Sequence, residues 1–274
     1  MVGQLGAVTA LLLAAGRGKR LRPLTEHWPK PLMPVNGRPL LEHWLGYMRE
    51  VGVDEVVVNV HHHVDEMLRF LERPIFRGWV HPSVEEEILG TAGAVRFNRE
   101  KLSGESVIVV HADNLCRCDF SDFVDFHRRR RPAHTDITMM TFEAEAPEAC
   151  GIVETDADDV VVGFHEKVLD PPGRRANGAV YILDRTVVDW IVEHPEVTDF
   201  STEVIPEYLG GIAAWHNSGV HRDVGTPEML DRAQRDAVSP AILEMAPDDE
   251  WSAWFSGHPI HSMVKALSFG EVER

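Results

Sequence analysis

Short runs of β-branched and aliphatic residues alternate along the chain with amphipathic stretches. Several of the runs are almost continuously apolar, which is typical of strands buried on both faces of a sheet. The predicted strands are Val8–Leu13, Glu55–Val60, Ser106–Val110, Asp136–Phe142, Val160–Phe164 and Ala179–Leu183. The predicted helices between them are Pro39–Val51, Val64–Leu71, Thr91–Asn98 and Phe120–Arg130.

This alternation predicts an α/β fold with a doubly wound, mostly parallel sheet in a three-layer sandwich. Ligands of such sheets bind beyond the carboxyl ends of the strands, so the residues just after each strand are the first candidates for a site. No internal repeat is visible, and in particular no hexapeptide period of a β-helix extension. We therefore expect one domain over residues 1–236.

The regular pattern loosens after Asp236, where we expect a partly helical tail over residues 237–274. Within it, Asp248–Ser256 contains Trp251, Trp254 and Phe255. The segment predicts one helix whose aromatic stripe packs either on the body of the protein or on a second subunit, as in a homo-oligomer.

Charge limits the class of partner. The chain of 274 residues has 27 Lys and Arg against 44 Asp and Glu, a formal net charge of −17, which argues against a sequence-independent grip on nucleic acid. A local cluster of cations and backbone N–H groups can still bind small phosphates. The three cysteines are too few for a disulfide framework, and the longest apolar runs are too short to span a membrane. We expect a soluble, cytoplasmic protein with no nucleic-acid and no membrane partner.

The segment Leu11–Thr25 leads from an apolar strand into two glycines and several cations. Glycine allows the backbone to turn sharply and to present its N–H groups to phosphate oxygens. The cations in this segment are Arg17, Lys19, Arg20 and Arg22, and Lys30 follows it. The sequence is neither a Walker A loop nor G-x-G-x-x-G, because Leu21 stands at the third glycine position. Glycine spacing alone favours a triphosphate site no more than an ordinary strand-to-helix turn.

Together with Pro29-Lys30-Pro31-Leu32, this segment resembles the signature of the sugar-1-phosphate nucleotidyltransferases. The similarity extends over roughly Val8 to Ala237 and implies a Rossmann-like, GT-A-type catalytic domain. It also implies a nucleoside triphosphate and a sugar 1-phosphate as substrates and Mg²⁺ as the cofactor. The resemblance assigns Arg20 and Lys30 to catalysis. Arg20 would assist the departure of pyrophosphate, and Lys30 would contact a phosphate. It assigns the surrounding loop to nucleotide binding through Leu13, Ala14, Ala15, Gly16, Gly18 and Lys19.

The segment Leu89–Ala94 resembles the base-reading loop of the same family and assigns Gly90, Thr91 and Gly93 to the nucleotide. The alternative is a capped helix start with tight packing.

Two aspartates follow predicted strands far apart in the chain, Asp113 after Ser106–Val110 and Asp223 after Gly219–Arg222. Carboxylate oxygen is the ligand that Mg²⁺ prefers, and one or two such ligands plus substrate phosphates suffice. A single aspartate after a strand is more often a helix cap. The pair resembles the two metal-binding aspartates of the family, in which Asp113 would also be catalytic. A D-x-D motif of glycosyltransferases is disfavoured by Leu115.

The sugar phosphate site rests on the resemblance alone, which assigns Gly151, Glu166, Lys167 and Asn177. Two positions depart from the family pattern. Cys150 stands where an aromatic residue is common, and Val168 replaces a proline.

The substrates are suggested by Asp199–Pro206 and by His221-Arg222-Asp223, which look most like the short guanylyltransferases for mannose or heptose 1-phosphate. GTP is therefore the favoured nucleotide. Uridylyl or thymidylyl transfer to another sugar 1-phosphate, and cytidylyl transfer to a non-sugar phosphate, stay open. So does a catalytically silent homologue that binds a nucleotide sugar and regulates a partner. The whole interpretation requires Asp113 and Asp223 to meet beside the Gly16–Arg20 turn.

Overall fold

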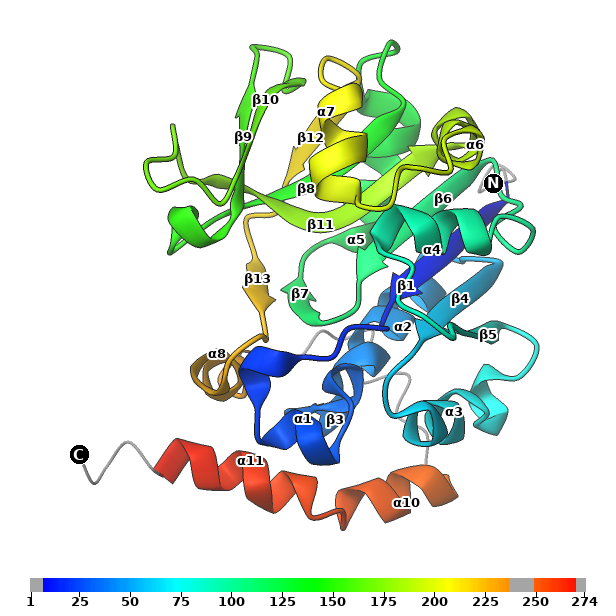
Figure 1. Ribbon diagram of the computed structural model, residues 1–274, viewed down its shortest axis with the longest axis vertical. Helices are drawn as coiled ribbons and strands as arrows, with labels where there is room; N and C mark the ends of the chain where they lie inside the picture. Colours follow the sequence, from blue (N-terminus) through cyan, green and yellow to red (C-terminus); the bar gives the residue numbers. More distant parts are fainter. Residues whose placement is uncertain (1–6, 237–248, 270–274) are drawn as a thin grey trace.

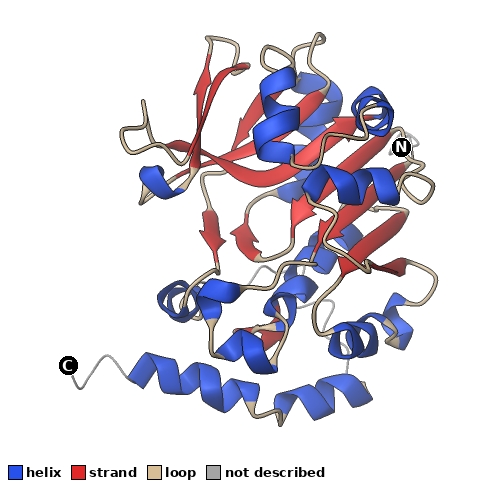
Figure 2. Cartoon of the chain, viewed as in Figure 1, coloured by secondary structure: helices blue, strands red, loops and turns tan. Residues whose placement is uncertain are grey.

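The computed structural model describes residues 7–236 and 249–269, which are arranged around one nine-stranded sheet (Figures 1 and 2). Its order is β10-β9-β11-β6-β1-β4-β5, with β8 paired to β11 and β12 paired to β8. The strands are β1 (Val8–Leu13), β4 (Glu55–Val60), β5 (Val80–Val84), β6 (Ser106–His111), β8 (Ile137–Glu143), β9 (Gly151–Thr155), β10 (Val161–Glu166), β11 (Arg175–Asp184) and β12 (Ile212–His216). The block β6-β1-β4-β5 is parallel, whereas β11 runs antiparallel to β6, β8 and β9.

Helices cover both faces of this sheet (Figure 2). They are α1 (Leu24–His27), α2 (Leu40–Glu50), α3 (Val64–Leu71), α4 (Thr91–Phe97), α5 (Phe120–Asp125), α6 (Arg185–Glu193), α7 (Ile205–Glu207), α8 (Pro227–Ala233), α10 (Glu250–Ser256) and α11 (Ile260–Phe269). Successive side chains of a strand point to opposite faces. Ala10 and Leu12 of β1 accordingly belong to the core beneath α2, α3 and α5, while Leu11 belongs to the core beneath α4 and α6. The predicted three-layer α/β sandwich is confirmed.

Shorter elements complete the described chain. They are the 3₁₀ turns η1 (Lys19–Leu21), η2 (Lys30–Leu32), η3 (Pro74–Phe76) and η5 (Pro147–Ala149), the π-helical turns η4 (Phe126–Arg130) and η6 (Phe200–Val204), and the strand pairs β2 (Pro34–Val35) with β3 (Arg38–Pro39) and β7 (Asn114–Arg117) with β13 (Val220–Asp223). The predicted helix Phe120–Arg130 is therefore α5 continued by the π-helical η4.

The parallel strands bring one set of loops to the same edge of the sheet. Because β1, β4, β5 and β6 run in one direction, the residues that follow them meet beyond their carboxyl ends. The glycine loop follows β1, Glu85 follows β5 and Asp113 follows β6. The β7–β13 ladder adds a segment from far along the chain, since its register pairs Asp223 with Asn114. The strands β7 and β13 lie beyond the end of β6 in Figure 1, and their register brings Asp223 close to that end.

In the described part of the tail, α10 lies within the predicted helix Asp248–Ser256, and α11 is a second helix that follows it. The helices α10 and α11 lie along the base of the molecule in Figure 1, beneath α1 and α3. Trp251 and Phe255 are buried in the same core cluster as α2 and α3, so the aromatic stripe packs on the body. Residues 237–248 and 270–274 of the predicted tail lie outside the described residues, and the division at residue 236 stays a prediction. No helix among the described residues is long and apolar enough to cross a membrane.

The aromatic cluster under α5 should carry much of the stability. Phe120 is fully buried against Trp44, Tyr47 and Phe123. Phe120→Ala removes these contacts and leaves a cavity, so we expect the free energy of unfolding to fall by about 3–5 kcal/mol in urea titrations. The matched control is Phe97→Ala, because the Phe97 ring is 56% exposed. A loss at Phe120 no larger than at Phe97 would contradict this packing.

Candidate active site

The glycine loop after β1 is held in shape by backbone geometry. Gly18 has a positive φ of 57°. Residues with a side chain rarely adopt this backbone conformation, whereas glycine does so readily. A Cβ there would also lie 2.9 Å from Cγ2 of Thr25 and 3.1 Å from Cβ of Lys30. The Gly18 carbonyl accepts hydrogen bonds from the Leu21 N–H and from the Thr25 hydroxyl. The loop is therefore packed directly against the segment that carries Lys30.

Lys30 brings the two distant aspartates together. Its Nζ lies 2.7 Å from Oδ2 of Asp113 and 3.1 Å from Oδ1 of Asp223. The lysine side chain is only 4% exposed, whereas the two carboxylates are 37% and 49% exposed. A buried ammonium needs such partners, because an unpaired charge away from water is costly. The required meeting of Asp113 and Asp223 beside the glycine loop is confirmed.

Arg20 lies on the open side of the same pair. One guanidinium nitrogen is 2.8 Å from Oδ2 of Asp223, and the side chain is 69% exposed. An exposed ion pair contributes little to stability, so this contact leaves Arg20 free to exchange a carboxylate for a ligand phosphate.

The electrostatics at Asp113 are set by two opposing effects. Burial by itself raises the pKa of this carboxyl, but the Lys30 ammonium and the neighbouring His111 outweigh it and hold the pKa below its ordinary value. Asp113 is therefore an anion at neutral pH. Burial lowers the pKa of His111, so this imidazole is neutral there. The carboxylate is thus ready to bind a cation without first losing a proton.

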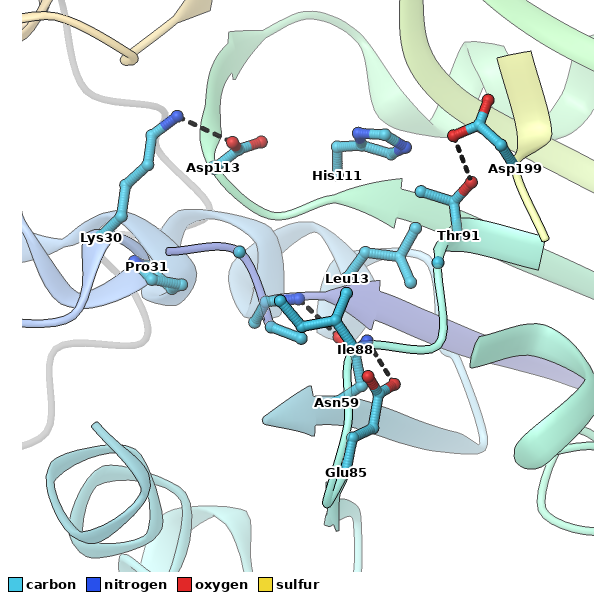
Figure 3. A pocket seen from close by; sticks show the side chains of 14 residues that line it. Leu13, Lys30, Pro31, Asn59, Glu85, Ile88, Thr91, His111, Asp113 and Asp199 are labelled. Atoms are coloured by element: carbon cyan, nitrogen blue, oxygen red, sulfur yellow. Dashed lines mark hydrogen bonds and ion pairs between the residues drawn. The ribbon is translucent and has the colours of Figure 1, made fainter. Parts of the chain in front are cut away.

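A cavity of about 200 Å³ opens beside Lys30 and Asp113 (Figure 3). Of the residues predicted to bind the nucleotide, Leu13, Ala14, Ala15, Gly16, Gly90 and Thr91 line it. Gly18 and Lys19 lie in the adjoining turn, and Gly93 is buried within α4 with its Cα facing Leu89. Gly90 has a φ of 79°, and a Cβ there would meet the Thr198 carbonyl at 2.4 Å. The loop at Gly90 is therefore held against the segment before η6.

The far wall of the cavity contains a buried carboxylate that the sequence did not single out. Glu85 is 4% exposed, and its Oε1 accepts a hydrogen bond of 2.8 Å from the Asn59 amide. Asn59 in turn accepts the Ala14 N–H at 2.6 Å, so the carboxylate is tied to the glycine loop. Figure 3 shows this pair opposite His111 and Asp199. A carboxylate can only accept hydrogen bonds, so Glu85 contributes acceptor oxygens to this wall.

The residues predicted for the sugar phosphate lie on β9, β10 and β11 or, in the case of Lys167, directly after β10. Gly151 pairs with Glu166 across β9 and β10, and Lys167 Nζ lies 2.6 Å from Oε1 of Glu166. Burial and the carboxylates of Asp223 and Glu166 raise the pKa of the Cys150 thiol, and Cys150 lines a cavity together with Asp223. Asn177 lies on β11, where its amide donates to the Tyr181 hydroxyl and its oxygen accepts the Ala179 N–H. Its side chain is thus already engaged within its own strand.

Asn59, Glu85, Ile88, His111 and Asp199 line the cavity without having been predicted. Asn59 offered one signal, since it is a polar residue inside the apolar run Glu55–Val60. Glu85 belongs to the acidic run Glu85–Glu87, in which no pattern distinguishes the buried member from its exposed neighbours.

Lys30→Met should raise the pKa of Asp113 above its ordinary value, because burial and the facing Asp223 carboxylate then act without a cation. Carboxyl ¹³C NMR titration in metal-free buffer measures this shift. Lys19→Met, which removes an exposed lysine of the same loop, is the control and should leave the titration unchanged. An unchanged pKa in Lys30→Met would mean that Lys30 does not govern this carboxylate.

Comparison with known proteins agrees with this geometry. The family described as nucleotidyl transferase matches residues 9–239. A mannose-1-phosphate guanylyltransferase of Mycobacterium tuberculosis (strain ATCC 25618 / H37Rv) is 34% identical over 245 residues, 86% of this chain and 67% of the relative. A protein of Oryza sativa subsp. japonica, named as a probable mannose-1-phosphate guanylyltransferase, is 33% identical over 226 residues, 80% of this chain and 61% of the relative.

The chain thus spans about two thirds or less of the length of these two relatives. Among solved structures, a protein of Bacillus anthracis named as a glucose-1-phosphate thymidylyltransferase, in complex with sucrose, superposes with a TM-score of 0.75 at 21% identity. The superposition covers 86% of this chain and 99% of that one, and it supports the fold alone. From the match over residues 9–239 and the glycine loop beside two converging aspartates, the chain belongs to the nucleotidyl transferase family.

Proposed function

We propose that the protein transfers a guanylyl group from GTP to a mannose- or heptose-like sugar 1-phosphate and releases pyrophosphate. The observation that carries this proposal is the bridge from Lys30 Nζ to Asp113 and Asp223 at the mouth of the cavity. It puts one buried cation and two carboxylates where two polyanionic substrates would have to meet. The guanylyltransferase relatives support the class of reaction and the choice of nucleotide.

The reaction is an in-line displacement. An oxygen of the sugar phosphate attacks the α-phosphorus of the nucleotide, a new P–O bond forms, and the bond to the β-phosphate oxygen breaks with its electrons going to pyrophosphate. Because like charges must approach, neutralisation and alignment dominate the catalytic task. Arg20, exposed beside Asp223, stabilises the departing pyrophosphate, while Lys30 and Lys167 screen the attacking phosphate. No step needs a covalent enzyme intermediate.

The site fits Mg²⁺. Two carboxylates converge on one point, and no set of three His, Cys, Asp or Glu side chains suited to a metal exists among the described residues. A larger set of protein ligands is not needed, because Mg²⁺ is usually bound by one or two carboxylates, with substrate phosphates and water as the other ligands. Asp113 and Asp223 would hold the ion. When bound, it would neutralise charge on the nucleotide phosphates.

Glu85 supports guanine as the base. The Watson–Crick edge of guanine presents two adjacent N–H donors, N1–H and N2–H, to which one carboxylate can accept both hydrogen bonds. Uracil and thymine offer one such donor between two acceptors, which face a carboxylate unfavourably. The Asn59 amide and the Leu89 N–H donate hydrogen bonds to the Glu85 carboxylate at 2.8 and 3.3 Å and fix its orientation. The wall is therefore preorganised for a donor-rich edge.

Free thiols at Cys116, Cys118 and Cys150 fit the proposed cytoplasmic location.

The direct test mixes the protein with Mg²⁺, each of four NTPs, and mannose, glucose or heptose 1-phosphate, and measures pyrophosphate release. We expect release to be fastest with GTP and a mannose- or heptose-type substrate. Arg20→Ala and Asp113→Ala should each lower kcat by at least about 100-fold, since both act on charge in the transition state. Lys101→Ala, which removes an exposed lysine that does not line the cavity, serves as the control. No pyrophosphate with any pair would overturn the proposed function and favour a nucleotide-sugar-binding regulator.

Base selection has its own test. Glu85→Gln loses charge and puts an amide where an acceptor is needed, so kcat/KM for GTP should fall about 10- to 100-fold. Glu86→Gln is the matched control, because Glu86 is exposed and off the cavity wall. Inosine triphosphate lacks the N2 amino group, so its kcat/KM should fall less than that of GTP when Glu85 is replaced by Gln. Equal kcat/KM values for wild type and Glu85→Gln would contradict guanine recognition by this residue.

A further inference from the structure

The helices α10 and α11 lie outside the family match, which ends at residue 239, yet they pack against the catalytic segment. Trp28 precedes Lys30 by two residues and is 2% exposed. Its ring stacks on Phe255 at a centroid distance of 5.9 Å and contacts the rings of Trp254 and His258 at 5.8 and 4.3 Å. Three rings from the tail thus cover one face of a residue beside the active site.

Trp28 in turn closes the loop that carries Lys30. The indole Nε1 donates a 2.7 Å hydrogen bond to the Leu32 carbonyl. Within this loop the Leu32 N–H bonds to the Pro29 carbonyl, and the Met33 N–H bonds to the Lys30 carbonyl. Two prolines stiffen it further by fixing their φ angles. The position of Lys30 therefore depends on the position of the Trp28 ring.

The tail helices are themselves anchored on the opposite side of the core. The buried guanidinium of Arg73 contacts Asp249 at 2.8 Å, Glu42 at 3.3 Å and the Ser252 hydroxyl at 2.9 Å. Asp249 also caps α10 by accepting the Ser252 N–H. Arg69 of α3 lies 3.9 Å from the centre of the Trp254 ring, a cation–π contact. Because α10 is fixed to α2 and α3 in this way, its ring cluster is a rigid support for Trp28.

The tail also reaches the other catalytic segment. Helix α11 packs against α1, β2 and α8, and α8 begins four residues after Asp223. One helix pair therefore touches both the loop that carries Lys30 and the helix that follows Asp223. These are two of the three groups that converge in the site.

We propose that α10, α11 and the turn between them are a positioning element of the active site, whose rings Trp254, Phe255 and His258 hold Trp28 and thereby fix Lys30 Nζ between Asp113 and Asp223. The inference rests on the proposed function, because it takes Lys30 as the group that screens the phosphates. These rings touch no substrate, so they are positioning residues and contribute through Lys30. A displacement of a catalytic group by about 1 Å can lower the rate by about 100-fold.

The test compares Trp254→Ala with Trp254→Phe, which keeps a ring, and with Val188→Ala. Val188 of α6 is fully buried in the other core cluster and controls for a general loss of stability. Assays run well below the melting temperature of every variant. We expect Trp254→Ala to lower kcat about 10-fold or more, with KM for GTP within about twofold because the walls at Glu85 and Gly90 are untouched. Trp254→Phe should recover most of kcat, and Val188→Ala should keep the wild-type value.

A kcat for Trp254→Ala no lower than that for Val188→Ala would overturn the inference. If Trp254→Ala does not fold, His258→Asn tests the same contact, since it removes the ring against Trp28 but retains an acceptor for the Ile260 N–H. An unchanged kcat in His258→Asn would equally overturn it. Failure of the proposed function is distinct, because the wild-type protein would then release no pyrophosphate at all.

Discussion

The structure of this site depends on one buried ammonium group shared by two carboxylates. Lys30 is almost fully covered, and neither Asp113 nor Asp223 is close to it in sequence. In surroundings of low dielectric constant the attraction between the ammonium and the carboxylates is strong. Without both carboxylates, however, the desolvation penalty of the buried lysine would exceed the remaining electrostatic attraction. The surrounding elements must therefore hold all three groups together. The fold is best understood as the means by which they are held.

Three devices do this. The parallel strands β1 and β6 end at the same edge, which puts the glycine loop beside Asp113. The short β7–β13 ladder returns the chain from more than a hundred residues away and pairs Asp223 with Asn114. The compact loop from Trp28 to Leu32 presents Lys30 between them. Each device uses backbone hydrogen bonds, so the geometry of the site is set before any ligand arrives.

Much of this could be predicted from the sequence. The apolar runs placed β1 and β4 at the observed bounds because buried strands have a strong pattern. The short strand predicted at Gly219–Arg222 is β13 shifted by one residue, whereas β5, which contains a histidine and a proline, and the four-residue β7 were not predicted. The buried Glu85 could not be recognised, since burial is decided by tertiary packing and its acidic neighbours are exposed. For the same reason the sequence showed an aromatic tail but not its contact with Trp28.

The central claim is that Asp113 and Asp223 share one ion beside the glycine loop. Anomalous diffraction from a crystal grown with Mn²⁺ in place of Mg²⁺ and a non-hydrolysable GTP analogue tests this most directly. The account predicts an anomalous peak about 2.1 Å from an oxygen of each aspartate, with the remaining ligands from nucleotide phosphates and water. A peak bound by neither carboxylate, or by only one while the other stays on Lys30, would contradict it.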